Sequence, residues 1–220
     1  MRFSAPKLED CSRHGADAEL FIVEGDSAAR TINRIRNPAN QAVFPMQGKP
    51  MNAIKADLDD LLENKQFAAL EQSLGIDLYE PLDLERLRYG KIILLFDPDA
   101  DGIHARTLML FFFYKWLRPL LDAGRVYDTH APQWKITSDS LKSAVYADTE
   151  WHFEKVKQKL ESSGVTDYKI KRYRGLASVD DKVLHQQCID SDSREVLVLS
   201  AENAEAALEL FEQMRQMGRE

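Results

Sequence analysis

The sequence predicts an α/β fold in which helices flank a parallel sheet and a smaller α+β region follows. Three observations support this prediction. Two short apolar runs, ELFIV at 19–23 and KIILLF at 91–96, each end in an acidic turn. A run of helix length, LMLFFFYKWLRPLL, follows the second turn and is apolar on nearly every side. Apolar strands that alternate with helices are typical of a parallel sheet buried on both faces.

The first 130 residues alternate strand and helix. The first apolar run is the first expected strand, and Ser27 is a suitable N-cap for a helix through AARTINRIR. A second strand is expected at 41–44, before the turn MQGKPMN and a polar helical region at 52–75. The second apolar run, the apolar helix at 108–121 and a strand at 126–130 complete the predicted sheet.

From about Gln133 the pattern changes to shorter strands and amphipathic helices, which indicates a second, smaller α+β unit. We expect helices at 149–162, 178–188 and 201–217, with strands at 168–173 and 195–199. The predicted domains are therefore 1–132 and 133–220.

The composition, 44% hydrophobic and 30% charged, is that of a folded soluble protein. No apolar run reaches the roughly 20 residues of a membrane span, and the N-terminus lacks a signal peptide, so we expect a cytoplasmic protein without a membrane partner. Cys11 and Cys188 have no metal-ligand spacing and are expected to be reduced thiols. The net charge of −7 argues against strong independent binding to nucleic acid, so any DNA contact should be local or shared.

Three carboxylates, Asp97, Asp99 and Asp101, occupy alternate positions directly after the second apolar strand. The carboxyl edge of a parallel sheet is where open α/β folds bind ligands. Carboxylates this close repel one another, and raised pKa values or a bound cation must relieve the repulsion. Oxygen-only ligands suit Mg²⁺ or Mn²⁺ and do not suit zinc.

The segment DPDADG allows two other interpretations. The segment matches the opening of an EF-hand loop, but Leu108 stands where the loop needs Glu, and a strand replaces the first helix. The segment is also a suitable acidic turn to cap a helix that begins near Ile103. Glu24 and Asp26 end the other clear strand, so two neighbouring strand ends would bring five acidic residues to one crevice. Taken alone, EGDS is equally typical of a helix cap.

Together, EGDSA at 24–28 and DPDADG at 97–102 resemble the Toprim signature, a Glu after one strand and D-x-D-x-D-G after a later one. The similarity continues through segments that resemble gyrase B and topoisomerase IV B subunits in the same order. These are KLEDC at 7–11, NQAVFPMQGKPMN at 40–52, LRYGKIILLFDPDADGIHARTLMLFFFY at 87–114, APQWKI at 131–136, YRGLAS at 173–178 and the closing helix AENAEAALELFEQM. The chain thus resembles the Toprim domain and C-terminal tail of type IIA topoisomerase B subunits.

The resemblance implies a Rossmann-like Toprim sheet and an isomerase component that acts on double-stranded DNA with a tyrosine-bearing A-type subunit of gyrase or topoisomerase IV. By this resemblance, Glu24 and Asp97 would bind the catalytic Mg²⁺, and Asp97 and Asp99 together would bind a second ion. Asp101 would complete the catalytic site. Mn²⁺ is an expected substitute. The implied DNA-binding residues are Lys49, Asn52, His104 and Arg106. Without the family, Lys49 could also be a loop lysine in solvent, and His104 and Arg106 are equally typical of a pair of helix-face residues.

The chain departs from the family in several places. B subunits carry an ATPase and a transducer domain ahead of this region, whereas Met1 stands just before KLEDC. We therefore expect ATP to act only through a domain absent from this chain, with a separate ATPase domain as a further candidate partner, and the chain alone to be inactive. Gln47 replaces a lysine, and Ala29 and Arg30 replace two glycines. Ala177 and Ser178 replace a glycine and a glutamate of the tail motif, which puts DNA affinity and partner docking in question.

Three functions remain open from the sequence. The first is the Toprim part of a type II topoisomerase. The second is a regulatory protein that docks on a gyrase A-like partner or on DNA without cleavage, which the missing ATPase and altered loops favour. The third is a Toprim nuclease or primase-like enzyme that works without a partner tyrosine, which the likeness to B subunits disfavours.

Overall fold

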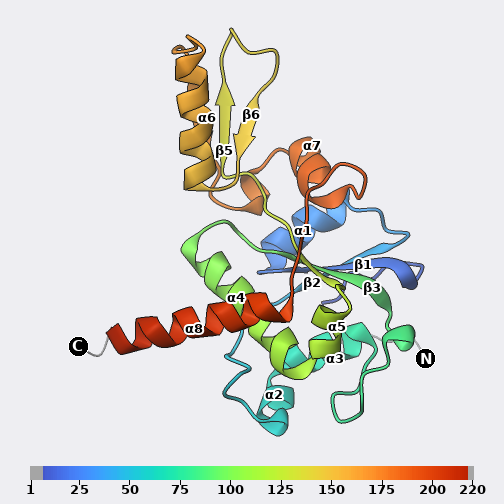
Figure 1. Cartoon of the computed structure of the whole chain (residues 1–220). Coiled ribbons are helices and arrows are strands. Elements are labelled where there is room, and N and C mark those ends of the chain that lie inside the picture. The colour runs from blue at the N-terminus through green and yellow to red at the C-terminus, as the bar shows by residue number, and fades with distance from the viewer. Residues whose placement is uncertain (1–6, 218–220) are drawn as a thin grey trace.

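Figure 1 shows the computed structural model, which describes residues 7–217, the side chains of 214–217 excepted. A five-stranded sheet in the order β2-β1-β3-β4-β8 forms its centre. The first four strands are parallel, and the fifth pairs antiparallel with β4. Their bounds are β1 Gly15–Val23, β2 Gln41–Pro45, β3 Tyr89–Leu95, β4 Val126–Asp128 and β8 Leu197–Val198. The predicted α/β fold with a parallel sheet is confirmed.

The central strands β1 and β3 are buried on both faces, as their continuous apolar runs predict. Alternate side chains enter two cores on opposite faces of the sheet, with Leu20 and Ile22 in one and Phe21 and Val23 in the other. Gly90 of β3 lies against the backbone of β1, because an added Cβ would lie 2.0 Å from the carbonyl oxygen of Ala16, so only glycine fits there. The register of the two strands shifts between Gly15 and Glu19 and is then continuous from Glu19 to Val23.

Helices cover both faces of the sheet (Figure 1). One face carries the core to which α3, α4, α5 and α8 contribute, and the other carries the core of α1, α7 and the turns beside it. The bounds of the helices before β4 are α1 Asp26–Ile35, α2 Leu58–Glu63, α3 Lys65–Leu74, the 3-10 turn η1 Leu84–Arg86, α4 Ala100–Trp116 and α5 Arg118–Asp122.

Three predicted helix boundaries were wrong, each for a local reason. Gly25 is the N-cap of α1, so Ser27 lies inside the helix. The region 52–75 forms two helices, because the side chain of Asn64 accepts hydrogen bonds that start a new helix, α3. The apolar helix α4 begins at Ala100, ahead of both the apolar run at 108–121 and the helix start expected near Ile103, and it ends at Trp116; α5 then starts at Arg118, with Pro119 in its first turn.

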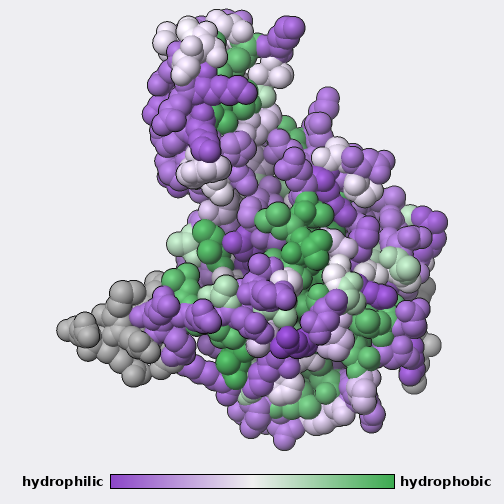
Figure 2. Space-filling model, viewed as in Figure 1, coloured by the Kyte–Doolittle hydropathy of each residue, from purple (hydrophilic) through white to green (hydrophobic). Residues whose placement is uncertain are grey.

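After β4 the chain forms a unit that projects from the first sheet (Figure 1) and holds a three-stranded sheet and a helix. The strand order is β6-β5-β7, with β5 Trp134–Thr137, β6 Val145–Ala147 and β7 Lys169–Arg172, and the helix is α6 Glu150–Ser162. Trp134 stacks on Phe153 of the helix with ring centroids 5.2 Å apart. Figure 2 shows mostly hydrophilic residues on the α6 side of this unit. The expected helix at 149–162 and strand at 168–173 are confirmed, whereas the β5–β6 hairpin had no predicted counterpart.

The last part of the chain returns to the first sheet. Where one helix was expected at 178–188, the structure has the 3-10 turn η2 Leu176–Ser178, α7 Asp181–Leu184 and the π-helical turn η3 His185–Ile189. β8 then joins β4, and α8 Ala201–Met217 packs on α4. The projecting unit thus begins with β5 at Trp134, while later segments complete the first sheet. Across the part of the chain described, no helix combines the length and apolar character of a membrane span.

Candidate functional site

Four acidic residues gather at the carboxyl end of the two central strands. Val23 and Leu95, the last residues of β1 and β3, are register partners. Glu24 comes directly after Val23 and Asp97 comes two residues after Leu95, so both leave the sheet at the same edge. Asp99 is the N-cap of α4, and Asp101 lies in its first turn. The charges of Asp97, Asp99 and Asp101 all act on Glu24, so the four carboxylates share one electrostatic environment.

Burial raises the pKa of Glu24, and the charges of Asp97, Asp99 and Asp101 raise it further. Its Oε2 atom is buried without a hydrogen-bond partner among the described residues. A buried carboxylate oxygen without a partner is costly unless a cation or a proton satisfies it. The surroundings of Glu24 therefore fit an oxygen-ligand cation site.

Asp97 lies between the start of α4 and the loop after β7. Burial raises its pKa, as does Asp99, while the backbone N–H of Leu176 donates to Oδ1 at 2.8 Å and opposes the shift. An added Cβ at Gly175 would lie 2.9 Å from Oδ2, and one at Gly102 would lie 2.0 Å from the Asp97 carbonyl oxygen. Glycine at these two positions lets both segments approach, which holds the Asp97 carboxylate in place.

The helix-cap interpretation of the acidic turn is also correct for one residue, since Asp99 Oδ1 accepts from the Gly102 N–H at 2.8 Å. Its second oxygen makes no hydrogen bond among the described residues. Asp26, the expected fifth member of the cluster, is instead exposed and pairs with Lys7 at 3.0 Å and Gln47 at 3.2 Å. The remaining four carboxylates offer only oxygen ligands, which suits a divalent cation such as Mg²⁺.

The four predicted DNA-binding residues differ in their surroundings. Lys49 is exposed in the turn after β2 and close enough to His104 to help burial lower the pKa of that imidazole. The side chain of Asn52 accepts from the Ile54 N–H at 3.1 Å within the chain. Arg106 donates to Asp128 at 2.7 Å and also contacts His130. The structure thus places Lys49 and His104 beside the acidic cluster, and DNA contact by all four stays a prediction.

The altered loops have internal partners of their own. Gln47, which stands where the family has lysine, donates to Asp26, and the Gly48 N–H donates to the Glu24 carbonyl oxygen at 3.0 Å. In the tail motif, the Ser178 hydroxyl donates to the Gly175 carbonyl oxygen at 2.6 Å. Gln47 thus ties its loop to the start of α1, and Ser178 closes the turn whose Leu176 N–H binds Asp97, without the residues usual in the family.

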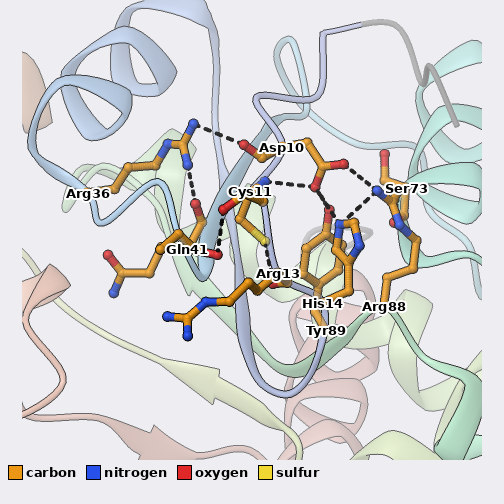
Figure 3. Close-up of polar contacts among 11 residues, drawn as sticks. Asp10, Cys11, Arg13, His14, Arg36, Gln41, Ser73, Arg88 and Tyr89 are labelled. Atoms are coloured by element: carbon orange, nitrogen blue, oxygen red, sulfur yellow. Dashed lines mark hydrogen bonds and ion pairs between the residues drawn. The ribbon is translucent and has the colours of Figure 1, made fainter. Parts of the chain in front are cut away.

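A second polar cluster, centred on Asp10, was not found from the sequence (Figure 3). The Asp10 carboxylate accepts from the Tyr89 hydroxyl at 2.6 Å and contacts His14 and Arg88. Burial alone would raise the pKa of Asp10, but these hydrogen bonds outweigh it and hold the pKa below its usual value. Asp10, Cys11 and His14 have metal-ligand atoms within 4.8 Å of one another, yet the Arg88 guanidinium already neutralises the carboxylate. The cluster fits a structural tie between the N-terminal segment and β3.

Glu24→Gln is expected to raise the thermal midpoint of unfolding in EDTA at neutral pH, because it removes a charge that burial and three carboxylates disfavour. The folded-state pKa of Glu24 lies above its ordinary 4.5, so its contribution to stability is full below pH 4.5 and is lost as pH rises through the folded-state pKa. The same variant should lose the further rise in midpoint that Mg²⁺ or Mn²⁺ gives the original protein. Differential scanning fluorimetry measures both effects.

Glu63→Gln is the matched control, since Glu63 is exposed on α2. It should leave the midpoint and the cation response unchanged. An undiminished cation response in Glu24→Gln would contradict the site.

Comparisons with known proteins agree with this geometry. The Toprim domain profile matches residues 19–130. The chain is similar to the DNA gyrase B subunits of Thermotoga maritima, 39% identical over 207 residues, and of Halalkalibacterium halodurans, 37% identical over 207 residues. It covers 32% of each of these relatives and matches them over 94% of its own length.

A solved structure is also similar, that of the Plasmodium falciparum topoisomerase II DNA-binding, cleavage and re-ligation domain. The TM-score is 0.70 and the identity 27%, over 81% of this chain and 25% of that one. Because the Toprim profile covers just over half of its 220 residues, this chain belongs to the Toprim domain family.

Proposed function

We propose that this chain is the metal-binding part of a type II DNA topoisomerase, which supplies Mg²⁺ for cleavage and rejoining of double-stranded DNA by a tyrosine-bearing A-type subunit. The observation that carries the proposal is the buried, unpartnered Glu24 oxygen within electrostatic range of Asp97, Asp99 and Asp101. The likeness to gyrase B subunits over 94% of the chain supports the choice of reaction. ATP would act through a separate domain.

The chain's own residues suit this chemistry. A divalent cation, when bound, polarises the scissile phosphate and stabilises the departing 3′ oxygen. Glu24 and Asp97 would hold one such ion, and Asp97 with Asp99 a second, while Asp101 orients the cluster. The raised pKa of Glu24 also suits it to exchange a proton with the departing oxygen. Lys49, exposed beside the cluster, would contribute its ammonium charge to a phosphate.

The test mixes the purified chain with a gyrase A-type or topoisomerase IV A-type subunit from the same source, plasmid DNA and Mg²⁺. Protein-linked DNA breaks are expected only when both proteins and the cation are present, with Mn²⁺ as a substitute. Glu24→Gln should abolish the breaks and Glu63→Gln should not. A complex that forms without breaks would overturn the proposal and indicate a docking or regulatory protein, and breaks by the chain alone would indicate a nuclease.

A further inference from the structure

Positive charge gathers on the projecting unit, in contrast to the rest of the chain. Residues 133–174 contain nine Lys and Arg against six Asp and Glu, whereas the whole chain carries a net charge of −7. Within this unit, β7 reads KIKR, and all four side chains are exposed. Arg174 follows two residues later and is also exposed. The projecting unit is thus the part of the chain whose charge favours an anionic partner.

The basic side chains of β7 form no ion pairs with the described residues. Among the described residues, no carboxylate oxygen lies within 4.0 Å of Lys169, Lys171, Arg172 or Arg174. Lys135 of the neighbouring strand, by comparison, pairs with Asp180 at 3.1 Å. Lys171 and Lys135 are direct register partners, and like charges in opposite positions destabilise a sheet. Lys171 lies over the Tyr173 ring at 4.8 Å, and its charge helps to lower the pKa of Asp180, but it forms no ion pair within 4.0 Å.

The position of β7 connects this charge to the acidic cluster. β7 is an edge strand of its sheet, so one side of it has no neighbouring strand. The chain continues from it through Arg174 directly into Gly175 and Leu176, whose backbone holds the Asp97 carboxylate. From Lys169 to Arg174 an extended chain spans about 17 Å. That length matches the axial rise of about five base pairs.

We propose that Lys169, Lys171, Arg172 and Arg174, the β7 strip, bind the phosphate backbone of duplex DNA next to the metal centre. The proposal rests on the proposed function, since it names a second surface for the same substrate. Ile170 is the one apolar side chain within β7, so the strip offers little to an apolar partner. Side chains alternate along a strand, so Lys169 and Lys171 lie on one face of β7 and Arg172 on the other, on either side of its free edge. Exposed cations that form no ion pair are suited to a regular polyanion, whose phosphates neutralise them with release of counterions. This local surface also reconciles DNA binding with a chain of net negative charge.

The test measures binding of the full chain to a fluorescent duplex of about 30 base pairs by anisotropy in EDTA, from about 25 to about 200 mM salt, a range over which phosphate contacts weaken measurably. Lys169→Glu/Lys171→Glu is compared with Lys155→Glu/Lys159→Glu, which makes the same change in net charge at two exposed positions of α6. The β7 variant is expected to bind at least about tenfold more weakly, with a salt slope smaller by about 2, because two phosphate contacts are lost. The α6 variant should stay within about twofold of the original protein.

Folding is checked by thermal unfolding of each variant. The Lys171→Glu change places opposite charges at a register pair, so the midpoint should not fall. Equal weakening in both variants, no weakening in either, or no binding by the original protein at the lowest salt would each overturn the proposal. Tighter binding of an RNA duplex than of DNA would also overturn it.

The DNA-binding result and the cleavage result are independent, because EDTA removes the cation on which cleavage depends. If the β7 changes leave cleavage with an A-type subunit unaffected, the proposed function stands and the β7 strip is refuted. Conversely, the β7 variant alone could lose DNA binding while the original chain never supports cleavage with an A-type subunit. That result would support the β7 strip and refute the proposed function.

Discussion

Asp97→Asn is expected to lower cation-dependent DNA cleavage, in the complex with an A-type subunit, by at least about a thousandfold. Loss of a cation that stabilises charge in the transition state costs several kcal/mol, and each 1.4 kcal/mol is about a factor of ten in rate. Asp97 is the ligand shared by both proposed ions, so its charge matters more than that of Asp99 or Asp101. Quantitation of protein-linked DNA at saturating duplex and varied Mg²⁺ measures the effect.

The substitution should leave the fold intact. Asparagine retains an oxygen to accept the hydrogen bond that the Leu176 N–H makes to Asp97, and it removes a charge that burial disfavours. Duplex binding in EDTA is therefore expected to stay unchanged. Asp122→Asn, an exposed change at the end of α5, is the matched control and should cleave normally. Cleavage by Asp97→Asn within about tenfold of the original would exclude Asp97 as a cation ligand.

Arg194→Ala is expected to lower the free energy of unfolding by about 3–5 kcal/mol, because it leaves a buried carboxylate without its main partner. Arg194 Nη1 donates to Glu19 Oε2 at 2.8 Å, and the two side chains are only 5% and 4% exposed. Arg194 also donates to the Ile189 carbonyl oxygen at 2.8 Å. These contacts join the segment before β8 to β1. For a chain of this size the thermal midpoint should fall by on the order of 10 °C.

Urea unfolding with linear extrapolation measures this change. Arg34→Ala, which removes the exposed pair with Asp181, is the control and should have little measurable effect. Replacing both partners, as in Glu19→Leu/Arg194→Met, should recover most of the loss, since neither charge then remains buried alone. A loss in Arg194→Ala no larger than in Arg34→Ala would show that the pair does not stabilise the fold.

Local sequence patterns were sufficient for the sheet and for the position of the acidic cluster. Short continuous apolar runs favour strands buried on both faces, and acidic turns after two neighbouring parallel strands meet at one edge of the sheet. Glu24 and Asp97 follow neighbouring strands for this reason. The ordered motifs extended the prediction to the family of gyrase B subunits, whose likeness the comparisons confirm.

Helix starts, by contrast, depend on which side chain caps the backbone, and several polar residues compete over a few positions. For example, Gly25 and not Ser27 is the N-cap of α1, and α4 begins at Ala100, ahead of its apolar run. The short strands β5 and β6 have too few residues for their alternation to stand out. Such elements are selected by packing, as where Trp134 stacks on Phe153.

The sequence alone determined the fold class, the family likeness and the acidic cluster, because each depends on periodicity or on motifs within a few residues. Only the tertiary structure decided that Leu176 holds Asp97, that Arg194 pairs with Glu19 across 175 positions, and that the basic side chains of β7 form no ion pair with the residues described. Contacts between distant segments leave no periodic trace in the chain. They follow from the way the tail folds back over the sheet, which brings each charge to its partner or leaves it without one.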